Sequence, residues 1–290
     1  KYFEGAQMIN RINFLGQIQT IQGKKNEHFQ TKPMECDCFV KSANLKESAI
    51  KKAKEIISEE LAEKNLETGV IISPDGEICQ ISTGNEHSCS FDTRKIAPNA
   101  LLIHGHPVEL PLSSGDIAVL LATPAGTQEA IMKDGKFSRI SKKTQDNGVG
   151  EYRQLYYELE KQLNLMALDK LGIDYKTNYD DVAAMGKDYI EYATGQSQED
   201  LSQEEIFEKL EKYGVDTNKT PKDIAEKLKE LMFYQLLLNP HKYDKEHNCI
   251  LDNIDTIKEF LETEEGLQIR HNLVQKAAQD YDLIYETNLF

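Results

Sequence analysis

Residues 100–122 read ALLIHGHPVELPLSSGDIAVLLA and contain the most informative pattern of the chain. It opens with the apolar run 100–103, which is typical of a buried strand. It closes with residues 114–122, an apolar segment that Ser113 precedes as a candidate helix N-cap and that Pro124 follows as a helix breaker. The stretch therefore predicts a strand, a loop and a helix.

The sequence before and after this stretch predicts the rest of one sheet. Apolar positions in residues 45–64 recur at helical spacing, and Asn44 with Glu47 would form a capping box at their start. Short β-rich runs occupy residues 69–73, 77–83, 128–132 and 136–140. Residues 44–140 are therefore predicted to form an α+β unit. An N-terminal extension, residues 1–43, precedes it and is predicted to be irregular or to contain a strand that ends at Phe39 and Val40.

The second half of the chain differs in period and in charge. Residues 141–150 have little to bury and are predicted to be a linker. Residues 1–150 carry 18 Lys+Arg and 19 Asp+Glu, whereas residues 151–290 carry 16 and 30. An acidic half would repel phosphate backbones, which argues against a nucleic-acid partner. Helical periodicity predicts an all-helical domain over 151–290, with helices at 151–171, 204–213, 221–238, 255–262 and 267–285.

The composition is that of a globular protein with about two domains. The 290 residues are 39% hydrophobic and 29% charged, with a formal net charge of −15. No run approaches the ~20 apolar residues that cross a bilayer, so no membrane partner is expected. Residues 1–8 lack a secretory signal pattern. The five cysteines lack zinc-finger spacing and are expected to be reduced thiols, which favours the cytoplasm and leaves secretion as an effector or toxin open.

Two histidines and one aspartate in the opening stretch have the pattern of a metal site. His104 and His106 are two residues apart on a predicted strand, so their side chains project to the same side. Asp116 lies in the first turn of the following helix, which brings its carboxylate back toward the imidazoles. Two nitrogens and one oxygen leave the fourth position of a tetrahedral Zn²⁺ to water, as in catalytic zinc sites.

Such a water needs a base that is not itself a ligand. Glu67, at the start of a neighbouring predicted strand, is the best-placed candidate. Glu63, in the preceding helix, and Glu77, beyond the turn, remain alternatives. His241 and His247 flank another loop and are a less specific candidate pair for a second metal.

His104-x-His106, Ser113-x-x-Asp116 and an upstream Glu67 together resemble the signature of the JAMM (MPN/JAB) zinc metalloproteases. The resemblance covers residues 44–140, including the order of helices and strands. It implies an MPN/JAB-like, cytidine-deaminase-like mixed sheet, with zinc held by His104, His106 and Asp116. It also implies Glu67 as acid/base and Ser113 as a donor to the oxyanion. The loop at 107–112 is one residue shorter than is common in the family, which keeps Ser114 open as an alternative to Ser113.

The resemblance implies a zinc-dependent hydrolase of peptide or isopeptide bonds. Ubiquitin-like proteins, with an extended C-terminal tail in the catalytic groove, are among the substrates that it implies. The acidic helical half would then offer a docking surface to a basic partner, and the Lys-, Asn- and Ile-leaning composition favours a bacterial or phage source. The alternative is a catalytically inactive scaffold of the same fold, which would purify without zinc. The sequence leaves the oligomeric state open.

Overall fold

The computed structural model describes residues 37–144, 146, 148–239 and 241–289, with side chains described from Lys46 onward. The chain divides into two compact units. The first comprises the described residues up to Glu160 and again from Arg270, and the second comprises Lys161–Ile269. These limits differ from the single boundary expected at residues 141–150. Within the described ranges, no helix combines the length and the apolar character that a membrane span requires.

The first unit is built on a six-stranded mixed sheet with the order β2-β1-β3-β4-β5-β6. β3 and β4 pair in parallel, and the other neighbouring strands pair antiparallel. The strands are β1 (Thr68–Ile72), β2 (Ile78–Thr83), β3 (Leu101–His106), β4 (Thr127–Met132), β5 (Phe137–Lys142) and β6 (Leu283–Thr287). The predicted α+β class with a mixed sheet is confirmed.

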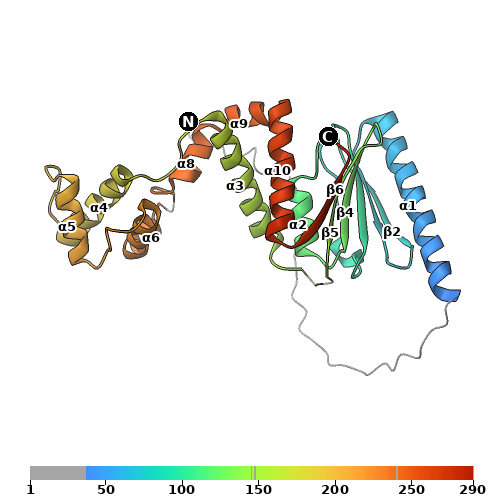
Figure 1. Ribbon diagram of the computed structural model, residues 1–290, viewed down its shortest axis with the longest axis horizontal. Helices are drawn as coiled ribbons and strands as arrows, with labels where there is room; N and C mark the ends of the chain where they lie inside the picture. The colour runs from blue at the N-terminus through green and yellow to red at the C-terminus, as the bar shows by residue number, and fades with distance from the viewer. Residues whose placement is uncertain (1–36, 145, 147, 240, 290) are drawn as a thin grey trace, which may run out of the picture. The chain divides into compact units, whose positions relative to one another are not determined.

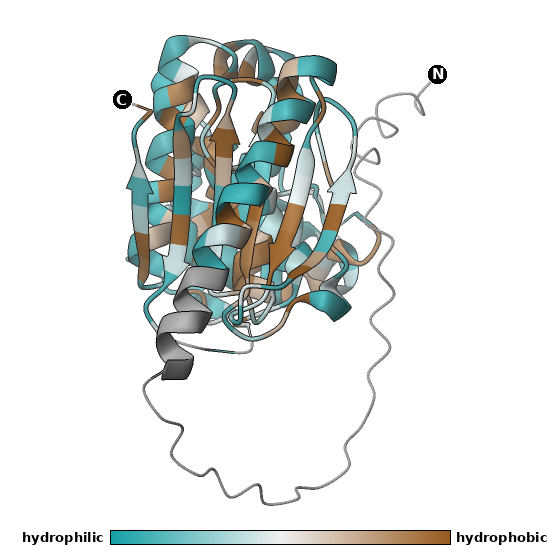
Figure 2. Ribbon diagram, turned by 90° about the vertical axis from the view of Figure 1, so that its right-hand side faces the viewer, coloured by the Kyte–Doolittle hydropathy of each residue, from teal (hydrophilic) through white to brown (hydrophobic). Residues whose placement is uncertain are grey.

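Different helices cover the two faces of this sheet (Figure 1). Figure 2 shows α1 (Asp37–Lys64) lying across one face. On that face it buries aliphatic side chains, among them Ile57 and Leu61, against Val70 and Ile103. Each such side chain contributes roughly 1.5–3 kcal/mol when fully buried. α2 (Ser114–Ala122) covers the other face, with bounds and an N-cap at Ser113 that match the expectation.

α1 begins earlier than the sequence suggested. The expected capping box of Asn44 and Glu47 is wrong, because Asn44 lies inside a helix that already starts at Asp37. Phe39 and Val40, expected to end a strand, are also helical. Neither Gly nor Pro interrupts residues 37–64, and Asn in a helix interior costs only about 0.7 kcal/mol. The rest of the predicted N-terminal extension, residues 1–36, lies outside the described residues.

The expectation of an all-helical second half is wrong for the C-terminal segment, which ends in a strand. α10 (Glu264–Asp280) stops five residues short of the predicted end at 285. Asp282 adopts a φ of 53°, and β6 then pairs antiparallel with β5, with Tyr285 opposite Ile140. The reason is tertiary: β5 would otherwise leave a row of backbone donors and acceptors unpaired at the sheet edge.

The expected linker is also partly ordered into the sheet. Ser141 and Lys142 complete β5. The Lys142 Nζ donates to the Thr123 carbonyl at 2.7 Å and pairs with Asp146. Val149, although 56% exposed, donates its backbone N–H to the carbonyl of Leu121. This segment therefore ties β5 to the end of α2.

The remaining helices lie between β5 and β6 in the sequence. Two of them, α4 and α8, were not predicted, and the expected helix at 221–238 is divided at Met232. Gly186 allows α4 to approach α5 closely, because a Cβ there would lie 2.6 Å from Leu210. These helices are α3 (Tyr152–Leu171), α4 (Tyr179–Thr194), α5 (Gln203–Lys212), α6 (Pro221–Leu231), α7 (Phe233–Leu236), α8 (Lys245–Asp252) and α9 (Ile254–Leu261), followed by α10.

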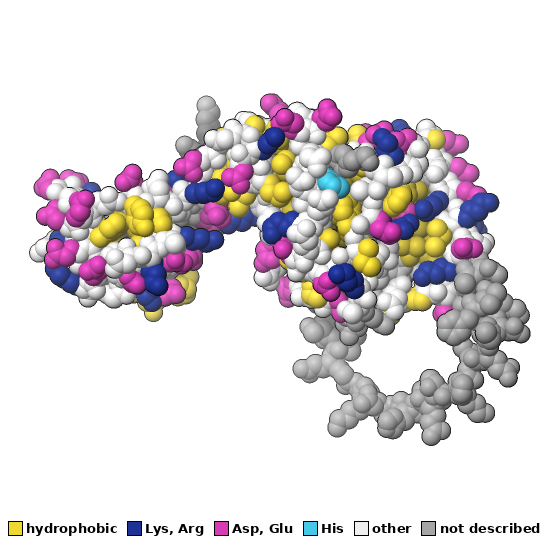
Figure 3. Space-filling model, viewed as in Figure 1, with side chains coloured by type: hydrophobic (Ala, Val, Ile, Leu, Met, Phe, Trp, Pro, Cys, Tyr) yellow, Lys and Arg dark blue, Asp and Glu magenta, His cyan; other side chains and the backbone are white. Residues whose placement is uncertain are grey.

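The second unit concentrates the acidic charge that the sequence analysis assigned to the second half. Residues 161–269 carry 13 Lys+Arg and 24 Asp+Glu. Figure 3 shows acidic side chains around the margin of the visible face of this unit, with lysines between them and hydrophobic side chains toward its middle. Such a surface would attract basic rather than acidic macromolecules.

Candidate metal centre

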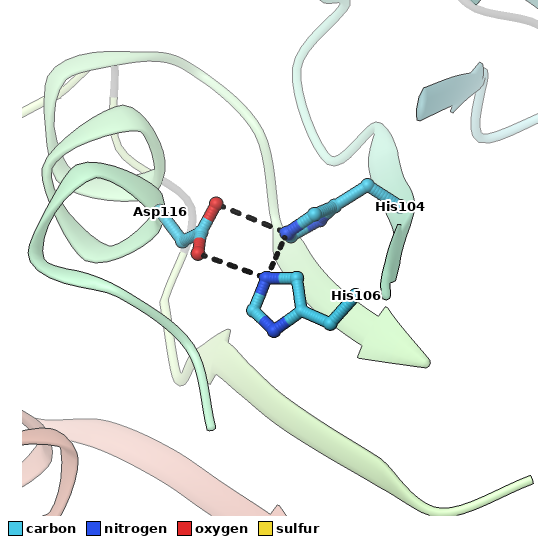
Figure 4. Close-up of side chains that lie close together, drawn as sticks. All are labelled: His104, His106 and Asp116. Carbon is cyan, nitrogen blue, oxygen red and sulfur yellow. Dashed lines mark hydrogen bonds and ion pairs between the residues drawn. The ribbon is translucent and has the colours of Figure 1, made fainter. Parts of the chain in front are cut away.

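Three side chains converge at the end of β3 (Figure 4). His104 Nε2 lies 2.9 Å from His106 Nε2 and 3.1 Å from Asp116 Oδ1. His106 Nε2 lies 3.7 Å from Asp116 Oδ2. Ligand atoms at about 2.0–2.1 Å from one tetrahedral Zn²⁺ lie about 3.4 Å apart, so these separations fit a shared cation. Among the described residues, this is the one group of three such side chains that could hold a metal ion.

Local sequence explains how β3 and α2 supply these groups. Successive side chains of a strand point to opposite faces, so both histidines face away from α1 while Gly105 lies beneath it. Asp116 is held by a capping box, because its Oδ2 accepts from the Ser113 backbone N–H at 2.8 Å and from the Ser113 hydroxyl at 2.7 Å. The cap of α2 therefore also orients the carboxylate toward the histidines.

The backbone fixes the tautomer of His106. Its Nδ1 lies 2.8 Å from the carbonyl oxygen of Leu110, which can only accept. Nδ1 must therefore carry the hydrogen, and the lone pair of Nε2 faces His104 and Asp116. A backbone carbonyl that accepts from the second nitrogen is a common partner of a metal-binding histidine.

The charges of the cluster support one another. His104 is 2% exposed and His106 is 6% exposed. Burial lowers the pKa of His104, but Asp116 and Glu67 outweigh this effect and leave the pKa above its ordinary value. Burial alone would raise the pKa of Asp116, yet the two histidines hold it well below its ordinary value. Asp116 is thus an anion that requires nearby positive charge.

Glu67 lies in the same cleft without joining the cluster of ligands. Its backbone extends the pairing of β1 and β2, with the Glu67 N–H donating to the Asn85 carbonyl at 2.8 Å. Burial raises the pKa of Glu67, which His104 and His106 partly oppose. Glu63 and Glu77, the alternatives, are exposed, and neither lines this cleft.

The cleft has a volume of about 210 Å³ and is lined by all five predicted site residues, His104, His106, Asp116, Glu67 and Ser113. Ser114 does not line it. That side chain is buried, and its hydroxyl has no hydrogen-bond partner among the described residues. Ser113 is therefore better placed than Ser114 for the predicted role.

The cleft also contains residues that the sequence analysis missed. Tyr152 from α3 and Arg270 from α10 belong to its lining, although both lie outside the predicted catalytic segment. Burial, and next the charge of Asp116, raises the pKa of Tyr152, so its hydroxyl stays protonated near neutral pH. Cys89 lines the cleft as a free thiol, and burial raises its pKa well above the ordinary value.

The other histidines and cysteines add no second site in the described part of the chain. The rings of His241 and His247 stack with centroids 4.1 Å apart, but no third ligand joins them among the described residues. Among the described cysteine side chains, Cys79, Cys89 and Cys249 form no disulfide. Cys36 and the side chain of Cys38 lie outside the described residues.

No protein-family model matches the chain, no curated protein is significantly similar to it in sequence, and no solved structure is significantly similar to it. The geometry of this cleft is therefore the basis on which a function can be inferred.

Proposed function

We propose that the first unit is a zinc-dependent hydrolase of the JAMM metallopeptidase type, which cleaves a peptide or isopeptide bond. One observation carries the proposal. The ligand atoms of His104, His106 and Asp116 lie within 4.8 Å of one another, in a cleft that also contains the non-ligand carboxylate of Glu67. The order of α1, the β1–β2 hairpin, β3, α2 and the β4–β5 hairpin agrees with the resemblance described above.

The donor set suits the proposed ion. Two imidazoles and one carboxylate, with a fourth position left open, are typical of catalytic zinc sites. A bound Zn²⁺ would supply Lewis-acid chemistry, by acidifying a water molecule and polarising the scissile carbonyl. His104, His106 and Asp116 would hold the ion.

Glu67 is the proposed acid/base. Its carboxylate would take a proton from the attacking water and later pass a proton to the leaving nitrogen. Burial and the raised pKa favour this exchange, because they bring the affinity of the carboxylate for a proton closer to that needed near neutral pH. Ser113 would turn its hydroxyl from Asp116, to which it now donates, toward the developing oxyanion.

The proposed substrate is a protein or peptide that enters the cleft in an extended form. A ubiquitin-like protein with an extended C-terminal tail is the specific class that the resemblance supports. The acidic second unit would recruit a basic partner or a basic region of the substrate. We place this activity in a bacterial or phage system, either in the cytoplasm or, after secretion, as an effector or toxin.

Metal analysis and turnover test the proposal together. The purified protein should contain about one zinc per chain, and the zinc-loaded form should cleave ubiquitin-like fusions or members of a peptide library. Glu67→Gln should retain the zinc and lose turnover. A wild-type protein that purifies without zinc and cleaves nothing would instead favour the inactive scaffold.

A further inference from the structure

A buried glutamine contacts two of the three proposed ligands. Gln128 belongs to β4 and is 1% exposed. The parallel register pairs it with Leu102, on the same face of the sheet as His104. Its Nε2 lies 3.3 Å from Asp116 Oδ1 and 3.5 Å from His104 Nδ1. Its Oε1 is buried and has no hydrogen-bond partner among the described residues.

This arrangement implies one tautomer of neutral His104. An amide nitrogen only donates hydrogen bonds, so His104 Nδ1 must accept from Gln128. The ring hydrogen is then on Nε2, which lies 3.1 Å from Asp116 Oδ1 and can donate to it. A cation ligated by Nε2 needs the opposite tautomer, in which Nε2 has a free lone pair and Nδ1 carries the hydrogen.

The side-chain amide of Gln128 can accommodate either tautomer. Its oxygen and nitrogen are similar in size, so a half-turn of the amide exchanges them without displacing neighbours. After the turn, Oε1 accepts from His104 Nδ1–H and gains a partner, whereas Gln128 Nε2 gives up its hydrogen bond to Asp116 Oδ1. The cation would then replace Gln128 Nε2 as the partner of that carboxylate. The imidazole loses a proton at Nε2 and takes one up at Nδ1, so its charge does not change.

We propose that Gln128 is a positioning residue of the metal centre, and that its Oε1 holds His104 in the tautomer that presents Nε2 to the cation. The inference rests on the metal site of the proposed function, but not on peptidase activity. The backbone carbonyl of Leu110 does the same for His106 and cannot be removed by substitution. The tautomer of His104 therefore depends on a side chain outside the His-x-His and Ser-x-x-Asp motifs.

Zinc affinity of two variants tests this role without any substrate. Gln128→Leu removes the acceptor with little change of volume, whereas Gln128→Glu keeps an acceptor at the same place. Loss of such an orienting partner typically weakens metal binding by roughly 10–100-fold. We expect that loss for Gln128→Leu in competition with a chromophoric chelator, and affinity at least equal to wild type for Gln128→Glu. Thr127→Val is the matched control, because Thr127 lies on the same strand and its hydroxyl contacts Ser141 instead.

Nitrogen-15 NMR of the histidine rings gives a second readout on the wild-type protein, which remains valid if Gln128→Leu does not fold. In the metal-free protein, kept so by a chelator, neutral His104 should carry its ring hydrogen on Nε2. After zinc is added, the hydrogen should be on Nδ1. His106 should carry its hydrogen on Nδ1 in both conditions. Equal zinc affinity of Gln128→Leu and wild type, or a His104 hydrogen that stays on Nε2 after zinc is added, would overturn the proposal.

These results separate the two proposals. Wild-type protein that binds zinc, shows the change of tautomer and cleaves nothing would refute the hydrolase but support the role of Gln128. If the wild-type protein cleaves substrate but Gln128→Leu binds zinc as tightly as wild type, the hydrolase would be supported and the role of Gln128 refuted. Wild-type protein that binds no zinc would refute both.

Discussion

Gly105 lies beneath Ile57 of α1, so close that a Cβ on Gly105 would approach the Ile57 Cγ2 to 2.7 Å. The residue between the two histidines therefore sets the distance between β3 and the helix on the opposite face. The close approach of α1 and the direction of both imidazoles are two consequences of one strand register.

Gly105→Ala should destabilise the first unit. The added methyl group would push against Ile57 and Leu61, and overpacking of this kind costs about 1–3 kcal/mol. Urea unfolding in chelator measures the change without a contribution from metal. Gly115→Ala is the control, because its Cβ would meet Ser113 Oγ at an ordinary 3.5 Å. Equal stability of the two variants would show that α1 can move away from β3 at little cost.

Glu67→Gln should separate metal binding from chemistry. The amide keeps the shape of the side chain but cannot take up the proton, and loss of a general base typically lowers turnover by roughly 10²–10⁴-fold. Zinc content should stay at the wild-type level, whereas Asp116→Ala should lose both zinc and activity. Glu77→Gln, at an exposed carboxylate outside the cleft, should leave both unchanged. Undiminished turnover of Glu67→Gln would assign the base to another group.

When a chelator has removed all metal, the free energy of unfolding of the first unit should fall as the pH rises above neutral. The pKa of His104 is raised, so its contribution is fully present below an unfolded value of about 6.5 and disappears as the pH passes the folded value. The raised pKa of Glu67 acts in the same direction, from about pH 4.5 upward. The lowered pKa of Asp116 stabilises the fold above about pH 3.8, and this contribution disappears as the pH falls through the folded value.

Zinc should reverse the trend around neutral pH, because protons compete with the cation for the histidines. The stabilisation by zinc should therefore increase with pH. The change of stability with pH can be measured without and with zinc from the midpoints of urea unfolding. These midpoints are compared at about pH 6 and about pH 8, once with chelator and once with zinc. His104→Gln should remove the contribution of His104 to the slope measured with chelator. The slope that remains comes from Glu67 and, with opposite sign below about pH 6.5, from His271, whose pKa is lowered by burial. The same slope in the variant as in wild type would mean that His104 does not have a raised pKa.

Leu283→Ala should show that β6 belongs to the fold of the first unit. Leu283 is 7% exposed, and truncation of a buried leucine costs about 2–5 kcal/mol. The neighbouring Ile284 is 47% exposed, so Ile284→Ala should stay within about 0.5 kcal/mol of wild type. Thermal unfolding of the two variants side by side measures the difference. Two equally stable variants would indicate that β6 is only loosely attached to β5.

The sequence alone determined the features that depend on neighbours along the chain. The bounds of α2 were correct because Ser113 and Asp116 form a local cap and because Pro124 stops the helix. His104 and His106 were placed on one face because alternation along a strand is a property of the backbone. Asp116 is assigned to the same site because it lies only ten positions beyond His106.

Features that depend on distant parts of the chain follow from tertiary packing and not from local sequence. The local pattern predicts a helix over the residues of β6. The strand forms because it pairs with β5, which precedes it by about 140 residues of sequence, and so distant a partner cannot be recognised from neighbouring residues. Tyr152, Arg270 and Gln128 belong to no local motif, and α3, α10 and β4 bring them to the cleft or to its ligands. Local propensity is a property of adjacent residues, whereas a buried polar group acquires its partner, and so its role, from whatever the fold packs against it.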